Sequence, residues 1–172
     1  AQKNVPDVRR AAERLVCMLD TETPVLFPQE RIVFTRTNPT VYSLFTQEEL
    51  ADIKRTHTLH EQGEVCNICV DYTRLMDTGF RSVRHRLTTR AAELRQASRA
   101  EEADYLLLQE GILDAVQRLS DRYRALALAG GRDDIAAMLS RVPMHAPETF
   151  PQALQMFRII HFTMWLGGNY HN

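Results

Sequence analysis

The sequence carries little net charge, few cysteines and no long apolar run, and each shortage argues against a class of protein. Its 21 lysines and arginines nearly balance its 22 aspartates and glutamates. The net charge of −1 gives no electrostatic reason to expect nucleic acid or an anionic membrane as a partner. The longest mostly apolar run, residues 159–166, is too short to span a bilayer. Three cysteines without a secretory signal predict a cytoplasmic protein rather than a disulfide framework.

Familiar catalytic motifs are also missing. The sequence has no phosphate loop, no G-x-S-x-G and no H-E-x-x-H, and its serine, histidine and aspartate residues are scattered. A composition of 44% hydrophobic and 25% charged residues over 172 positions is ordinary for one globular domain. The residues alone therefore indicate a helical domain without naming its chemistry.

Apolar residues at helical spacing dominate what is present. Periodicity and capping residues predict helices over residues 8–19, 46–60, 71–94, 103–128, 135–139 and 149–166. Residues 30–34, reading ERIVF, are the best strand candidate, so we expect at most one short strand or hairpin near residues 25–34. No repeat or linker divides the chain. The sequence predicts a mainly α fold in a single helical region, residues 1–172.

The predicted last helix is apolar around nearly its whole circumference. Thr149 can cap it and Pro151 suits its first turn, while only Arg158 and His161 interrupt the apolar residues that follow. Such a helix must be enclosed by other protein, yet few residues follow Leu166. We therefore expect the chain to be part of a larger body.

Two histidines and two cysteines form the most suggestive local pattern. His57 and His60 are followed by Cys66 and Cys69, which are residue types that zinc prefers. Finger-type sites separate their ligand pairs by roughly a dozen residues, whereas His60 and Cys66 are much closer. Zinc stays open as an alternative to a helix end with exposed histidines and half-buried thiols. A redox pair at the two cysteines is less well supported, since no βαβ alternation surrounds it.

Basic residues gather between Arg81 and Arg99 and could form a nucleic-acid stripe. They lack interleaved aromatic residues and are followed by Glu101 and Glu102. Solvation, or salt bridges to a neighbouring helix, explains them better.

Three segments occur in an order that is typical of one family. GEVCNICVDYTRLMDTGF, residues 63–80, holds an Asp-Tyr pair and then a Gly-Phe pair. RDDIAAMLSRVPMHAPETFPQALQMFRIIHF, residues 132–162, holds a Val-Pro, a Pro-x-Thr-Phe and an apolar helix beginning A-L-Q. Residues 8–33, VRRAAERLVCMLDTETPVLFPQERIV, read as a first helix and a loop into Glu-x-Ile-Val. The ordered set resembles the N-terminal part of the glycyl radical enzymes, the pyruvate formate-lyase-like family.

The resemblance implies a parent enzyme of anaerobic metabolism, built as an α/β barrel of two five-stranded halves wrapped by helices. In that family a glycine radical, installed by an S-adenosylmethionine-dependent iron–sulfur activating enzyme, passes to a cysteine at the barrel centre. Members are lyases, dehydratases or decarboxylases. This sequence has neither the Arg-Val-x-Gly radical loop nor a cysteine in a Gly-Cys loop. We therefore expect an N-terminal fragment that acts as scaffold and part of the substrate-cavity wall, binds no cofactor itself and is not catalytic alone.

One site residue follows from the resemblance. Where many dehydratase-like members have a substrate-contacting histidine before the Asp-Tyr pair, this sequence places Asn67. An amide can orient a substrate by hydrogen bonds but cannot act as a base near neutral pH. A backbone turn or cap at Asn67 is the open alternative. We read Asp71 first as a helix cap, and His161 and Asn169 as packing residues.

The implied partners are the rest of the enzyme and the activating enzyme, with no nucleic acid and no membrane. A rival interpretation is a stand-alone helical interaction module that forms a homodimer through residues 150–166. A second rival is a small zinc-binding regulator built on the two histidines and two cysteines named above.

Overall fold

The computed structural model describes residues 7–35, 45–56 and 70–167. These residues form helices and, within the same ranges, no strand. The helices are α1 (Asp7–Thr21), α2 (Gln47–Thr56), α3 (Tyr72–Gln96), α4 (Ala100–Ala129), α5 (Asp133–Leu139) and α6 (Phe150–Leu166). The mainly α fold predicted from the sequence is confirmed, and residues 57–60 of the predicted second helix lie outside the described ranges.

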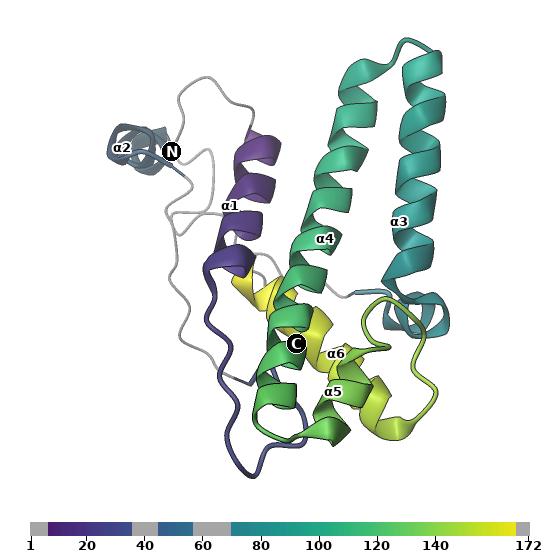
Figure 1. Ribbon diagram of the computed structural model, residues 1–172. Helices are drawn as coiled ribbons and strands as arrows, with labels where there is room; N and C mark the ends of the chain where they lie inside the picture. Colours follow the sequence, from purple (N-terminus) through teal and green to yellow (C-terminus); the bar gives the residue numbers. More distant parts are fainter. Residues whose placement is uncertain (1–6, 36–44, 57–69, 168–172) are drawn as a thin grey trace.

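The longest helix, α4, lies at the centre of the molecule. Figure 1 shows α3 antiparallel beside it in a tall hairpin, with α1 on the other side of α4 and with α5 and α6 near its lower end. Helix α4 ends at Gly130, and the chain turns through Gly131, whose φ of 68° favours glycine. The predicted end of the helix at these two glycines is confirmed.

The main core lies around the lower half of α4. The ring of Phe34 stacks on Tyr123 of α4 at 4.4 Å between centroids and meets Phe162 of α6 edge-on at 5.5 Å. The same core cluster holds completely buried side chains from α1, α4, α5 and α6: Leu19, Leu119, Ile135, Met156 and Ile159. The core therefore joins α1, α4, α5 and α6 to the segment that ends near Phe34.

Helix α2 is attached to α1 by a local cluster separate from the main core. The guanidinium of Arg10 donates to both carboxylate oxygens of Glu49 at 3.0 Å and lies 5.5 Å from the ring centroid of Phe45. Glu49 also accepts a hydrogen bond from the Thr46 N–H at 2.7 Å, while its own N–H donates to Thr46 Oγ1 at 3.2 Å. These last two bonds are the predicted capping box.

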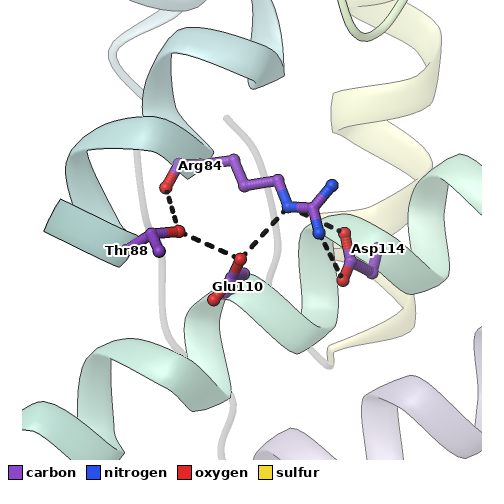
Figure 2. Close-up of polar contacts among 4 residues, drawn as sticks. All are labelled: Arg84, Thr88, Glu110 and Asp114. Carbon is purple, nitrogen blue, oxygen red and sulfur yellow. Dashed lines mark hydrogen bonds and ion pairs between the residues drawn. The ribbon is translucent and has the colours of Figure 1, made fainter. Parts of the chain in front are cut away.

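The upper half of the α3–α4 hairpin is held by a small apolar cluster and by ion pairs. Figure 2 shows Arg84 of α3 beside Glu110 and Asp114 of α4, with Nε 3.2 Å from Glu110 and 3.3 Å from Asp114. Thr88 Oγ1 also donates to Glu110, at 3.0 Å. The predicted salt bridges between the basic run of α3 and a neighbouring helix are therefore confirmed.

Residues 30–34, the best strand candidate, form no strand in the structure, which agrees with the expectation of at most one strand near residues 25–34. A strand needs a neighbour to receive its backbone hydrogen bonds, and no second strand exists among the described residues. The segment is nevertheless buried at Val33 and Phe34, because a side chain of α6 takes the place of a neighbouring strand.

Candidate functional site

Two of the segments that carry the resemblance meet at Gly79, where α3 bends. Gly79 has φ 70° and ψ 172°, a conformation that is essentially restricted to glycine. A Cβ added there would lie 2.5 Å from the carbonyl oxygen of Met144. The close approach lets the N–H groups of Phe80 and Arg81 donate to the carbonyls of Pro143 and Met144, at 2.9 and 3.0 Å. The Gly-Phe pair therefore joins α3 to the Val-Pro segment.

The Asp-Tyr pair places the start of α3 against α6. Asp71 Oδ1 accepts a hydrogen bond from the Arg74 N–H at 3.1 Å, which confirms the predicted cap. The ring of Tyr72 packs against Phe157 of α6, with 5.0 Å between centroids. Phe157 in turn lies 6.1 Å from the His161 ring. The chain thus enters α3 beside the part of α6 that carries these two rings.

Gln155, in the A-L-Q sequence, links α6 to the family segment of residues 8–33. Its side chain is completely buried. The Val33 N–H donates to Oε1 at 2.8 Å, and Nε2 donates back to the Val33 carbonyl at 3.3 Å. The amide thus makes the pair of bonds that a neighbouring strand would make. All three segments of the resemblance are therefore held together around α6 and the lower end of α3.

One side of α6, here called its outer face, remains uncovered. Phe150, Leu154 and Phe157 are 75%, 41% and 44% exposed and follow one another at helical spacing. Ile160, by contrast, is buried, and Met164 is half-buried. The expectation that other protein must enclose the whole helix is therefore corrected: this chain buries one side itself and leaves the outer face exposed.

Arg158 lies at the edge of the outer face and has no carboxylate partner among the described residues. Its Nη1 lies 2.7 Å from Nδ1 of His161, and its guanidinium is 5.9 Å from the ring centroid of Phe162. Burial lowers the pKa of Arg158, while Tyr123 acts in the opposite direction. Since a partly buried charge is costly unless it is paired, this cation is incompletely compensated within the described residues.

A hollow of about 770 Å³ lies beside the start of α6. Arg132, on its wall, donates to both carboxylate oxygens of Asp134, at 3.0 and 2.9 Å. The same guanidinium donates to the carbonyls of Pro28 and Glu30, at 3.1 and 2.6 Å. The hydrogen bond from Arg132 lowers the pKa of Asp134. The Arg132 guanidinium therefore links the loop at residues 28–30 to the start of α5.

Comparisons with known proteins agree with the family resemblance of these segments. The family model described as pyruvate formate lyase-like matches residues 34–172. The chain belongs to this family. A solved structure of a glycyl radical enzyme from Archaeoglobus fulgidus has a similar fold, with a TM-score of 0.73 and 21% identity over 96% of this chain. The chain spans 30% of the length of that protein. The comparison with curated proteins found no match.

The pyruvate formate lyase-like match covers most of the site. It begins at Phe34 and takes in the Asp-Tyr pair, the bend at Gly79 and all of α6. Helix α1 precedes the match, but the structural similarity covers 96% of the chain and therefore extends to it. The family resemblance read from the sequence is confirmed.

The ligand candidates predicted from the sequence are not tested. Residues 57–69 lie outside the described ranges, and they include Asn67 and the zinc candidates His57, His60, Cys66 and Cys69. Asn169, near the end of the chain, also lies outside them. Among the residues that the structure does describe, no group of three or more histidine, cysteine, aspartate or glutamate side chains could hold a metal ion. In the same part of the chain, no helix has both the length and the apolarity needed to cross a membrane.

Sequence reasoning missed the roles of Gln155 and Arg158. Both are polar residues within an apolar helix, and a buried polar side chain generally has a hydrogen-bond partner. That rule could have indicated that Gln155 binds something. It could not have identified Val33, which is far away in the sequence.

Proposed function

We propose that this chain is the N-terminal helical part of a glycyl radical enzyme, in which it acts as scaffold and forms part of the substrate-cavity wall. The observation that carries the proposal is the meeting of the three family segments through Gly79, Tyr72 and Gln155. The chain's 30% share of the solved relative's length supports a role within a larger protein. The exposed outer face of α6 supports the presence of covering protein.

On this proposal the radical chemistry belongs to the remainder of a cytoplasmic enzyme. The sequence contains no Arg-Val-x-Gly and no Gly-Cys, so the radical glycine and the reactive cysteine would both lie outside it. An S-adenosylmethionine-dependent iron–sulfur enzyme would be the activating partner. This chain would contribute no proton transfer, and the reaction would be that of a lyase, dehydratase or decarboxylase.

The coding sequence after Asn172 tests the proposal most directly. We expect it to continue into a Gly-Cys loop and a later Arg-Val-x-Gly loop. The full-length protein, activated without oxygen, should then show the electron paramagnetic resonance signal of a glycyl radical. The matched control replaces the glycine of that loop with alanine, which should remove the signal. A stop codon at this point, together with a stable monomeric chain, would contradict the proposal.

Asn67 is proposed to orient substrate in the full-length enzyme. Asn67→Ala should raise KM by about tenfold because one hydrogen bond to bound substrate is lost, with a smaller change in kcat. The measurement is steady-state kinetics on the activated enzyme, with the unfolding temperature followed in parallel. A lower unfolding temperature with unchanged KM would show that Asn67 only shapes the backbone.

A homodimer that buries the outer face of α6 is the alternative function that the exposed Phe150, Leu154 and Phe157 favour. Sedimentation of the 172-residue chain separates the two ideas. A discrete dimer that Leu154→Glu dissociates supports the interaction module. A chain that aggregates through this face without a defined state, or that is only marginally stable, supports the enzyme fragment.

A further inference from the structure

We propose that Arg158 is the docking point for a carboxylate, supplied by an aspartate or glutamate on an apolar segment that covers the outer face of α6. The segment belongs to the remainder of the enzyme, so the inference rests on the proposed function. The covering segment must have apolar side chains over α6 and one acidic side chain beside Arg158.

The first support is a contrast with five arginines that link elements in the described residues and have a carboxylate within 3.3 Å: Arg10, Arg84, Arg95, Arg118 and Arg132. Arg122, which also links elements, donates to the carbonyls of Leu19 and Glu22. Arg158 has His161 and the Phe162 ring instead, although it is half-buried. Covering it further without an anion would leave a desolvated, uncompensated charge, which is strongly unfavourable.

The guanidinium is also held ready for a carboxylate. The bond to His161 uses Nη1, and the Phe162 ring supports the planar group. A guanidinium has five N–H donors in a fixed fork. The donors that the described contacts leave unused can therefore bind both oxygens of a carboxylate, the strongest geometry for such a pair.

The neighbouring surface favours a protein segment over a small carboxylate. Phe150, Leu154 and Phe157 extend along α6 for about two turns, roughly 10 Å, and apolar side chains of a protein would cover them. A small anion at Arg158 would leave this stripe exposed to water.

A second copy of the chain is the less suitable occupant. Residues 150–166 contain no aspartate and no glutamate, so two outer faces related by a two-fold axis would bring no carboxylate from α6 to Arg158. The nearest acid at the start of α3 is Asp71, next to Tyr72, and it already accepts the N–H of Arg74. Glu148, the acid just before α6, already pairs with Arg141 at 2.8 Å, so an acid from a different surface is the better partner for Arg158.

Cysteine labelling tests the inference in the full-length enzyme. Leu154→Cys reacts with a maleimide, and mass spectrometry of the peptide reports the rate at position 154 in the 172-residue chain and in the full-length protein. We expect at least about tenfold slower labelling in the full-length protein, because the outer face is covered. Adding Arg158→Met should then restore most of the lost rate, an acceleration of about tenfold or more, since a carboxylate is left buried and unpaired.

The controls separate a paired arginine from a merely structural one. Arg158→Met in the 172-residue chain should leave the unfolding temperature unchanged or raise it, because the cation has no carboxylate partner to lose within residues 7–35, 45–56 and 70–167. In the full-length protein the same change should lower the unfolding temperature. Arg86→Met, on the exposed surface of α3, should change neither protein.

The outcomes distinguish the inference from the proposed function. Equal labelling of position 154 in both proteins would overturn the inference but not the proposed function, which the glycyl radical signal of the full-length protein tests separately. Protection that Arg158→Met does not change would overturn only the inference. Protection of the 172-residue chain that grows with its concentration and is lost in Arg158→Met would place the carboxylate on a second copy and overturn the inference.

Discussion

The lower end of the molecule and the upper half of the α3–α4 hairpin are both helical, but different forces hold them. At the lower end, backbone touches backbone at Gly79, and the buried Gln155 binds the main chain of Val33. In the upper hairpin, exposed ion pairs such as Arg95 with Asp104, 3.3 Å apart, accompany a small apolar cluster. The first region depends on particular residues, and the second on the sum of many weak contacts.

This difference explains where the family resemblance resides. A position where only glycine fits, or where one amide satisfies two backbone groups, admits few substitutions. An exposed ion pair adds little free energy and can be exchanged for another. The segments that identify the family therefore lie at the lower end, and mutations in the two regions should differ sharply in their effects.

The largest effect is expected at Gly79. Gly79→Ala forces a Cβ against the carbonyl of Met144 in a conformation that disfavours alanine, so the free energy of unfolding should fall by about 3 to 5 kcal/mol. Urea denaturation followed by circular dichroism measures the change. Gly111→Ala is the matched control, because nothing lies within 4 Å of a Cβ built there and alanine favours the helix. A loss below about 1 kcal/mol at Gly79 would show that the α3 bend is not constrained.

The next largest effect is expected at Gln155. Gln155→Leu keeps a similar volume but leaves the N–H and carbonyl of Val33 without their partner, which should cost about 2 to 4 kcal/mol. Denaturation gives the magnitude, and amide hydrogen exchange at Val33 should accelerate with it. Gln117→Ala, which removes only an exposed bond to Asp121, should cost less than about 0.5 kcal/mol. Equal losses for the two variants would contradict the special role of Gln155.

Helices and caps could be predicted from the sequence because their signals are local. Thr149 caps α6 with a capping box through Gln152, and Asp71 caps α3, as their positions indicated. The bend at Gly79 could not be predicted from periodicity, because it exists to let residues of a distant loop approach. The strand candidate at residues 30–34 does not form a strand for a similar reason. The partner of its backbone at Val33 is the distant side chain of Gln155 rather than a strand.

The candidate site could be predicted only in part. The apolar character of α6 indicated burial but not which side its own chain would cover, because that depends on how α6 packs against α4 and α5. Arg158 was visible as an interruption, while its lack of a carboxylate emerges only from three-dimensional contacts. The exposure of a side chain and the compensation of its charge depend on its neighbours in three dimensions, which a single sequence does not specify.

The upper hairpin should tolerate loss of its central ion pair. Arg84→Met removes the bonds to Glu110 and Asp114 and should lower the free energy of unfolding by about 0.5 to 1 kcal/mol. A double-mutant cycle with Glu110→Gln should give a coupling energy of similar size that shrinks as salt is added. A coupling above about 2 kcal/mol would place this network in the same class as the lower end and remove the contrast.

The smallest effect concerns α2, which the Arg10–Glu49 ion pair and a small apolar cluster help to attach to α1. The hydrogen bond from Arg10 is the main reason that the pKa of Glu49 is lowered from 4.5 to about 2. Because the folded pKa lies below the unfolded one, the stabilisation is fully present above about pH 4.5 and is lost as the pH falls toward 2.

Carbon-13 NMR of the Glu49 carboxyl should therefore show a midpoint near the lower of these values. In Glu49→Gln the difference in stability from wild type should vanish at the acid end of that range, because protonation makes the two side chains alike. Glu13→Gln, elsewhere on the exposed surface of α1, should leave the pH dependence of α2 attachment unchanged. A Glu49 midpoint at the ordinary value would mean that the Arg10 contact does not persist in solution. Helix α2 would then lack the contact from Arg10 and be held more weakly than the lower end or the upper hairpin.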